Sequence, residues 1–363
     1  MNPLKGLREY RQSFWVDFIS RSLLTSGELQ RLIDEDGLSG LTSNPSIFQK
    51  SISGSKDYEE YINRFLEQSP QANEHELYEH IAVEDIQMAA DVLRPVYDKT
   101  QGVDGYVSLE VSPHLAYDTD GTITTALEYW RAVSRPNLMI KVPATNEGIP
   151  AIEVLTAEGV NVNITLMFSM KHYEAVANAF IRGLSSHPKP STIASVASFF
   201  VSRVDTAVDK ALSTIGTPEA LALRGKAAIA NAKLAYRRYQ QIFEGDAFSS
   251  LRSKGARPQR LLWGSTGAKN PAFRDVVYVE ELIGPDTVNT MPVETANAFR
   301  DHGRREARLL SNVADAEETL NSLLRLGLDL NVVGEQLQND GVKLFADAFD
   351  QLLSALKQKC EIK

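Results

Sequence analysis

One lysine occupies an unusual place in this chain. Lys141 lies within residues 138–143, an otherwise apolar run in which a charged ammonium group is costly. Apolar neighbours disfavour the ammonium form and leave neutral amine, which can attack a carbonyl and form a Schiff base. The alternative is a lysine on an edge strand that extends its amine into water. The residues predicted around it must decide between the two.

Acidic and amide side chains lie in similar runs. Asp17 and Glu110 are each embedded in a strand-like apolar segment, although a lone acid in a strand is often only an ion-pair partner. Asn161, Asn163 and Thr165 alternate along another run, so an extended strand places all three on one face. An amine nucleophile, two acids and several amides are the groups that a carbonyl reaction needs.

Three further polar residues belong to this set, and two of them, Arg203 and Asn44, have two interpretations each. Ser198 and Arg203 end a sixth run, but Arg203 could instead pair with Asp205 on the surface at the start of a helix. Asn44 precedes Pro45, the pattern of a helix N-cap followed by proline at the first helical position. One asparagine cannot easily cap a helix and bind a substrate together.

Strand-like runs that alternate with helical patterns indicate βαβ units and a parallel sheet. Eight runs fit this description, at residues 14–19, 40–43, 107–112, 137–142, 161–168, 192–202, 260–264 and 286–291. Eight repeats predict an α/β fold of the (β/α)8 TIM barrel type, in which reacting groups stand at the carboxyl ends of the strands. A doubly wound sheet is the alternative architecture, but the sequence lacks the Gly-rich first turn that accompanies such a sheet.

Helical patterns fill the segments between these runs. Residues 51–105 form the longest insertion, which we expect to hold two or three helices separated near Ser69 and Pro70. The tail at 312–359 is predicted to be helical, broken near Gly327 and Gly341. We therefore expect a single domain over 1–363, with 305–363 as a C-terminal helical extension packed on the barrel.

Composition limits the classes of function. With 43% hydrophobic and 23% charged residues, the 363-residue chain is ordinary for a globular protein. Its net charge of −9 argues against nucleic acid as a partner, so a phosphate-bearing ligand needs a local basic pocket. The single cysteine, Cys360, allows no intrachain disulfide and suits a reducing cytoplasm. No apolar stretch approaches the length that spans a membrane, and the polar start resembles no signal peptide.

The sequence contains no motif for a metal or a nucleotide cofactor. Its six histidines are scattered, and His75 and His80 are spaced by five rather than by the four that places two on one helix face. It has no GxxxxGK[ST] loop, no GxGxxG after a strand and no nucleophile-elbow serine. We therefore expect no metal and no cofactor.

Six segments together resemble the transaldolases, and in particular the longer subclass found in actinobacteria, cyanobacteria and plants. The segments are GLTSNPSIF at 40–48, VSLEVS at 107–112, NLMIKVPAT at 137–145, NVNITLMFS at 161–169, ASFFVSRVD at 197–205 and NTMP at 289–292. The resemblance extends over nearly the whole chain. It implies a class I aldolase barrel with the Schiff-base lysine on the fourth strand, where Lys141 falls.

The resemblance also implies the reaction and the residues that perform it. The family transfers a dihydroxyacetone unit from sedoheptulose 7-phosphate or fructose 6-phosphate to glyceraldehyde 3-phosphate or erythrose 4-phosphate, in the non-oxidative pentose phosphate pathway and without a cofactor. Lys141 is the implied nucleophile, Glu110 acts through a water held by Thr165, and Asp17 exchanges the hydroxyl proton on carbon 4. The residues implied to hold the dihydroxyacetone hydroxyls are Asn44, Asn163 and Ser198.

Two positions bear on specificity. Phe200 stands where the related fructose-6-phosphate aldolases carry a tyrosine, so it favours transfer over release, unless it only packs the barrel. The short transaldolases show a serine and an arginine close together after the seventh strand, whereas this chain has Ser265 and Lys269 at a longer spacing. Lysine lacks the bidentate fork of arginine, so the expected phosphate site combines Arg203 with Ser265 and Lys269.

Two other functions remain open from the sequence. One is an aldolase that releases free dihydroxyacetone, and the other is a sugar-phosphate-binding protein that has lost turnover. The expected partners are sugar phosphates, with no membrane partner, and the assembly is a monomer or a homodimer.

Overall fold

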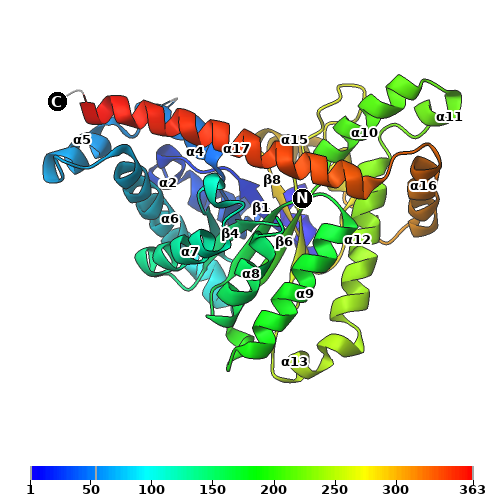
Figure 1. Ribbon diagram of the computed structural model, residues 1–363, viewed down its shortest axis with the longest axis horizontal. Helices are drawn as coiled ribbons and strands as arrows, with labels where there is room; N and C mark the ends of the chain where they lie inside the picture. The colour runs from blue at the N-terminus through cyan, green and yellow to red at the C-terminus, as the bar shows by residue number, and fades with distance from the viewer. Residues whose placement is uncertain (1, 54, 362–363) are drawn as a thin grey trace.

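Eight parallel strands form a closed barrel in the computed structural model, which describes residues 2–53 and 55–361 (Figure 1). Each strand pairs with its neighbour in sequence, and the last pairs with the first, so the sheet has no edge. The strands are β1 Gln12–Asp17, β2 Gly40–Thr42, β3 Tyr106–Glu110, β4 Leu138–Pro143, β5 Val162–Met167, β6 Ser195–Phe200, β7 Arg260–Gly264 and β8 Thr287–Met291.

All eight predicted strands are therefore confirmed, in the predicted order, and the doubly wound alternative is wrong. The apolar runs locate the strands because nearly every strand residue is buried between the barrel interior and the surrounding helices. Boundaries differ by a few residues. The expected sixth strand at 192–202 is shorter, because Pro190–Thr192 form a 3-10 turn and Ser202 already begins a helix.

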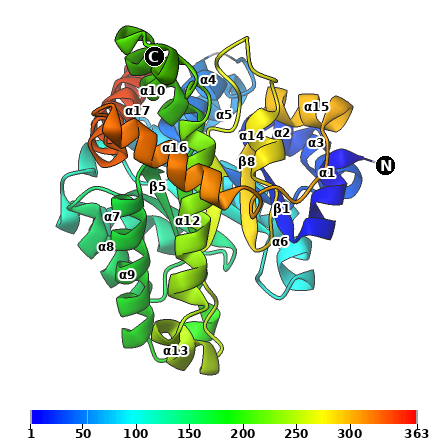
Figure 2. The same cartoon turned by 90° about the vertical axis from the view of Figure 1, so that its right-hand side faces the viewer.

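Helices surround the barrel (Figures 1 and 2). They are α1 Pro3–Gly6, α2 Arg21–Thr25, α3 Glu28–Arg31, α4 Pro45–Ser53, α5 Glu59–Gln68, α6 Glu74–Lys99, α7 Thr119–Val133, α8 Gly148–Ala157, α9 Met170–Ser186, α10 Ser202–Ile215, α11 Pro218–Leu221, α12 Ala227–Phe243, α13 Ser249–Ser253, α14 Val277–Glu281, α15 Val293–His302, α16 Val313–Arg325 and α17 Leu330–Glu361.

The described part of the insertion at 51–105 holds the end of α4, then α5 and α6, in agreement with the expected two or three helices. Ser69 and Pro70 lie between α5 and α6. Asn73 then caps α6 through a capping box, in which its side chain accepts from the Glu76 amide and the Glu76 carboxylate accepts from the Asn73 amide. Helix α4 packs against α17 at the carboxyl end of the barrel, whereas α6 packs along β3.

The C-terminal helices differ from the prediction in one respect. A break occurs at Gly327, which has a φ of +81°, but α17 continues through Gly341 without interruption. A Cβ at Gly341 would lie 2.8 Å from Leu166 Cδ2, so this glycine permits close packing of α17 on the barrel. The expected break at Gly341 is wrong because a glycine pattern does not distinguish a helix end from a close contact.

Helix α17 crosses the carboxyl ends of the strands (Figure 1). Its Gln338 amide donates to the backbone carbonyl of Ala144 at 2.9 Å and to that of Leu166 at 3.0 Å, at the ends of β4 and β5. Helix α16 packs separately on α12. The tail is thus attached to the barrel by buried hydrogen bonds as well as by apolar packing.

The barrel interior contains a layer of apolar side chains below the carboxyl end. Members of this layer include Trp15, Tyr106, Met139, Val196, Leu262 and Val288. Met139 and Val196 each precede an expected site residue by two positions, Lys141 and Ser198, so they lie one layer deeper on the same strand face.

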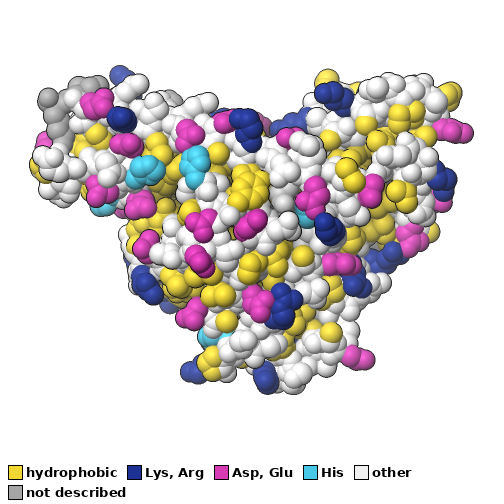
Figure 3. Space-filling view, in the orientation of Figure 1, with side chains coloured by type: hydrophobic (Ala, Val, Ile, Leu, Met, Phe, Trp, Pro, Cys, Tyr) yellow, Lys and Arg dark blue, Asp and Glu magenta, His cyan; other side chains and the backbone are white. Residues whose placement is uncertain are grey.

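The described surface carries both signs of charge. Asp and Glu side chains are interspersed with Lys and Arg over the face that carries α17, α7 and α8 (Figure 3). Among the described residues, none of the helices combines the length and the apolar character needed to cross a membrane.

Candidate active site

A cavity of about 700 Å³ opens at the carboxyl ends of the strands. Eight of the expected site residues line it, and they are Asp17, Asn44, Lys141, Ser198, Phe200, Arg203, Ser265 and Lys269. They come from strands and loops throughout the sequence. The barrel brings them together because the carboxyl ends of parallel strands meet on one face.

Lys141 is buried inside the barrel, with 3% of its surface exposed. Its amine lies 3.1 Å from Glu110 Oε2 and donates to the Ser43 carbonyl at 3.0 Å. Because β4 is a central strand of a closed sheet, an edge lysine that extends into water is excluded. The amine is therefore held inside the cavity in a fixed direction.

Glu110 is the acid nearest to this amine. It pairs with Lys141 in strand register across β3 and β4, and 6% of its surface is exposed. Burial raises the pKa of Glu110 above its ordinary value, whereas the Lys141 charge and hydrogen bond lower it and the Asp17 charge raises it. We infer that this carboxyl group is easier to protonate than a free glutamate, which suits proton exchange.

Asp17 ends β1 on the other side of the cavity. The Thr42 hydroxyl donates to Asp17 Oδ1 at 2.6 Å, and Thr42 Oγ1 lies 2.7 Å from Thr290 Oγ1. Burial raises the pKa of Asp17, while Lys141, the Thr42 hydrogen bond and Arg203 lower it. The two acids therefore have different partners, an amine for Glu110 and a threonine for Asp17.

Asn163 and Ser198 are joined inside the barrel. The Ser198 hydroxyl donates to Asn163 Oδ1 at 2.6 Å, and the Asn163 amide donates to Ser108 Oγ at 2.9 Å. Asn163 lies in register with Lys141. Asn161, by contrast, hydrogen-bonds backbone groups of Pro136, Leu138 and Ala194 at the start of β5, away from the cavity.

Thr165 lies two positions closer to the carboxyl end of the same strand, in register with Pro143. Its hydroxyl oxygen is buried and has no hydrogen-bond partner among the described residues. A buried hydroxyl without a protein partner is uncommon, because leaving it unpaired costs about 1–3 kcal/mol. Thr165 does not line the main cavity itself.

Asn44 performs the capping role that its sequence suggested, and it also lines the cavity. Its Oδ1 accepts from the Ile47 amide at 3.0 Å, at the first turn of α4. Among the described residues, no partner is found for its Nδ2 group, which leaves an amide donor for a ligand. The two interpretations of Asn44 are compatible because they use different atoms.

Arg203 is held over two aromatic rings. Its guanidinium carbon lies 5.5 Å from the centre of Phe200 and 5.9 Å from the centre of Phe345 in α17. The surface pair with Asp205 is wrong, because Asp205 is buried and accepts from Tyr278 Oη at 2.8 Å. Burial lowers the pKa of Arg203, and Asp17 raises it.

Ser265 and Lys269 lie in the loop after β7. Ser265 has a left-handed backbone with a φ of 54°, and its hydroxyl lies 2.9 Å from the Ser202 hydroxyl at the start of α10. Lys269 is exposed at the rim of the cavity. The serine is therefore held near Arg203 by α10, whereas the lysine extends from a separate part of the loop.

Several lining residues were missed by sequence reasoning. Those with polar groups are Thr42, Ser46, Gln49, Lys50, Thr290 and Glu294, and those from the C-terminal helix are Leu344, Phe345 and Ala348. A threonine in a strand and a leucine in an amphipathic helix give no signal that they face a site. Lys50, close after the motif at 40–48, is the one that the sequence pattern could have suggested.

Within residues 2–53 and 55–361, no group of three or more His, Cys, Asp or Glu side chains is placed to hold a metal ion.

Known proteins match this chain over nearly its whole length. A family model described as Transaldolase/Fructose-6-phosphate aldolase matches residues 14–356. A transaldolase of Thiobacillus denitrificans is 48% identical over 360 residues, covering 98% of this chain and 100% of that protein. Transaldolases of Mycobacterium marinum and Thermobifida fusca are 45% and 46% identical, with 99% of this chain and 98% of each relative covered. The chain is therefore an enzyme of the transaldolase family, built on the (β/α)8 barrel.

Proposed function

We propose that this enzyme transfers a dihydroxyacetone unit between sugar phosphates through a Schiff base on Lys141. The observation that supports this most directly is the buried amine of Lys141, which lies 3.1 Å from the Glu110 carboxylate inside a cavity of about 700 Å³. A deprotonated amine adds to the ketone at carbon 2 of a ketose phosphate. Loss of water then gives an iminium, which accepts the electron pair when the bond between carbon 3 and carbon 4 breaks.

Glu110 is proposed to move the protons of Schiff-base formation. The amine addition and the loss of water each need a proton to be taken and returned. Glu110 is the acid nearest to Lys141, and burial raises its pKa, so it takes up a proton more readily than a free glutamate does. A water between Glu110 and Thr165 is part of this proposal. It is supported by the buried Thr165 hydroxyl, which has no hydrogen-bond partner among the described residues.

Asp17 is proposed to act on carbon 4. As a carboxylate it takes the hydroxyl proton while the carbon bond breaks, and the aldose phosphate leaves. An acceptor aldehyde then enters, the enamine attacks its carbonyl carbon, and Asp17 returns the proton to the new hydroxyl. The hydrogen bond from Thr42 supports this role, since it favours the carboxylate form that burial disfavours.

The dihydroxyacetone hydroxyls are proposed to bind Asn44, Asn163 and Ser198. Asn163 and Ser198 already hydrogen-bond one another, so each is oriented before a ligand binds. The Nδ2 group of Asn44 is available as a donor on the α4 side. The phosphate is proposed to bind Arg203, with Ser265 and Lys269 beside it in the same cavity.

Phe200 favours transfer over release. Its ring packs against Phe168, with centroids 5.2 Å apart, and faces the cavity without a hydroxyl that could position water. We propose that the enamine therefore waits for an acceptor aldehyde. Assay of free dihydroxyacetone without an acceptor tests this, because an aldolase releases it at the rate of turnover.

The setting of the enzyme is also a proposal. We propose a cytoplasmic location, supported by the single cysteine in the sequence. We propose a monomer or a homodimer, because one chain contributes every residue of the candidate site; light scattering in solution decides between them. The hydrogen bonds of Gln338 support a single domain over 1–363, with 305–363 packed on the barrel.

Borohydride reduction in the presence of fructose 6-phosphate tests the mechanism. We expect peptide mass analysis to find a three-carbon adduct on Lys141, and none in Lys141→Ala. If the ketose phosphate binds and no adduct forms on any lysine, the non-catalytic alternative is correct. An adduct on another lysine would overturn the assignment of the nucleophile.

A further inference from the structure

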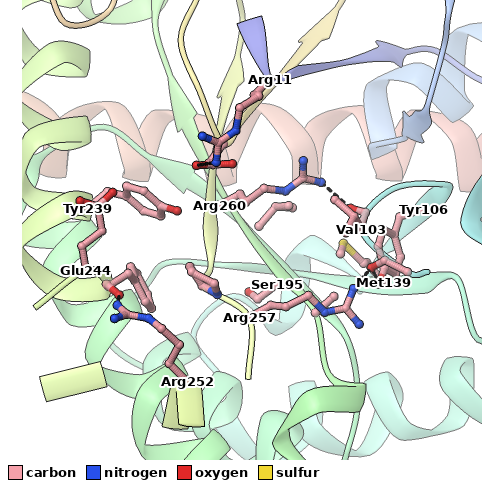
Figure 4. A pocket seen from close by; sticks show the side chains of 16 residues that line it. Arg11, Val103, Tyr106, Met139, Ser195, Tyr239, Glu244, Arg252, Arg257 and Arg260 are labelled. Carbon is pink, nitrogen blue, oxygen red and sulfur yellow. Dashed lines mark hydrogen bonds and ion pairs between the residues drawn. The ribbon is translucent and has the colours of Figure 1, made fainter. Parts of the chain in front are cut away.

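A second cavity lies at the opposite end of the barrel from Lys141. It measures about 440 Å³ and opens at the amino ends of the strands, between the start of β6 and the segment that joins α12 to β7 (Figure 4). None of its lining residues lines the first cavity. The apolar layer that contains Met139, Val196 and Leu262 separates the two.

The body of this cavity is apolar and aromatic. Met139 and Val196, each 1% exposed, contribute to its wall from the barrel interior. Tyr106, Tyr239 and Phe243 contribute aromatic side chains around them. Surfaces of this kind bind flat apolar groups, and the volume is within the range of about 300–1,000 Å³ found for small-molecule sites.

Four arginines lie around this cavity (Figure 4). Among the described residues, only two carboxylates, Asp286 and Glu244, line it with them. Two of the arginines are neutralised, because Arg11 pairs with Asp286 at 2.5 Å and Arg260 pairs with Asp104 at 3.0 Å. The second lining carboxylate, Glu244, is exposed at the mouth.

Arg252 and Arg257 differ from the other two arginines. Arg252 donates to the Phe243 carbonyl, and Arg257 donates to the carbonyls of Gly102 and Ser191. Within the described part of the chain, neither is paired with a carboxylate. Backbone carbonyls orient a guanidinium but leave its positive charge uncompensated, so this mouth attracts anions although the chain as a whole carries a charge of −9.

We propose that this cavity is a second ligand site, for a small aromatic anion. Its flat ring lies between Tyr239 and Val103, and its carboxylate or phosphate group binds Arg252 at one side of the mouth. Sugar phosphates suit the site less well, because many of their hydroxyl groups would face the apolar side chains that form part of its wall. The ligand therefore differs in chemistry from the substrates proposed for the first cavity.

Fluorescence titration of the full chain with 8-anilinonaphthalene-1-sulfonate tests the proposal, because this probe joins fused aromatic rings to one anionic group. We expect saturable binding that weakens about tenfold or more in Arg252→Glu, the scale of one lost charged hydrogen bond. Lys254→Glu is the matched control, because it makes the same charge change two residues away on an exposed side chain outside the lining. It should bind the probe as the unmodified enzyme does.

Two further variants locate the probe. Ala194→Leu fills part of the cavity without a change of charge and should weaken binding. Arg203→Glu, in the first cavity, should leave the affinity unchanged. Absence of saturable binding overturns the proposal, and so does equal weakening by Arg252→Glu and Lys254→Glu. Weakening by Arg203→Glu but not by Arg252→Glu would place the probe in the first cavity and overturn it as well.

Discussion

Lys141 and Glu110 stand at the same register on neighbouring strands, with amine and carboxylate 3.1 Å apart in the barrel interior. Each is buried, so each depends on the other as its charge partner. A buried pair of this kind contributes little net stability, because desolvation of both groups offsets their attraction. Its position beside an open cavity fits the catalytic role that we propose for it.

Replacement of the lysine should abolish turnover and preserve the fold. Lys141→Ala removes the only amine that we place against the substrate carbonyl, and Glu110 can take a proton rather than remain as a buried unpaired charge. We expect loss of transfer by at least about a thousandfold, the scale of covalent and proton-transfer catalysis combined. A coupled assay measures the rate and circular dichroism the fold, with the exposed Lys210→Ala as control. An unchanged rate would refute the mechanism.

The two acids should act at different steps. Glu110→Gln is expected to slow Schiff-base formation, because it removes the proton carrier nearest to Lys141. Asp17→Asn is expected to form the Schiff base at the normal rate and to slow cleavage of the carbon bond. Rapid mixing with borohydride quenching resolves the two steps. Identical behaviour of the two variants before steady state would contradict this division.

The pH dependence of the reaction should respond to Thr42. Its hydrogen bond lowers the pKa of Asp17, which burial raises above the ordinary value of 3.8. Because Asp17 acts as a carboxylate, the rate falls as pH drops through its pKa. Thr42→Val removes the lowering contribution, so the acid limb of the kcat profile should move to higher pH. Thr290→Val is the control. It should move the acid limb less, since Thr290 contacts Thr42 and no hydrogen bond between Thr290 and Asp17 is found among the described residues.

Arg203 should matter for phosphorylated donors. Arg203→Ala is expected to raise KM for fructose 6-phosphate by about 10- to 100-fold, the scale of a lost charged hydrogen bond. The same variant should change the reaction of unphosphorylated fructose much less. Steady-state kinetics with both donors makes the comparison. Equal losses for the two would mean that Arg203 supports the cavity and does not bind phosphate.

Gly334 should be required for the close packing of α17 on the barrel. A Cβ there would lie 2.8 Å from Ser169 Cβ, so alanine must displace the helix even though it is the better helix former. We expect Gly334→Ala to lower the free energy of unfolding by roughly 1–3 kcal/mol, the usual cost of overpacking. Urea denaturation measures this, with Val332→Ala as control because Val332 is 68% exposed. A stabilised Gly334→Ala would show that the contact is loose.

The tertiary structure alone decided how several polar residues are used. Whether Lys141 was exposed at an edge or buried beside an acid depended on closure of the sheet, which joins β8 to β1. Arg203 could have paired with Asp205 as far as the sequence showed, but α10 turns Asp205 toward Tyr278 and leaves Arg203 over Phe345.

The role of residues in the C-terminal helix could not be predicted from the sequence either. Gly341 looked like a helix break, and its actual role depends on a side chain, Leu166, that lies far away in the sequence. No local pattern in the sequence indicated that Thr42, Thr290 and Phe345 line the cavity. Their contacts join segments that lie far apart in the sequence.

The sequence by itself determined the order of the eight strands and the type of chemistry. Parallel strands buried on both faces must be apolar, so a polar residue inside such a run stands out, as Lys141, Glu110 and Asp17 did. Local patterns report burial and periodicity, which depend on near neighbours. The pairing of amine with acid, threonine with aspartate and arginine with aromatic ring depends on which faces meet after folding, and only the closed barrel and α17 decided that.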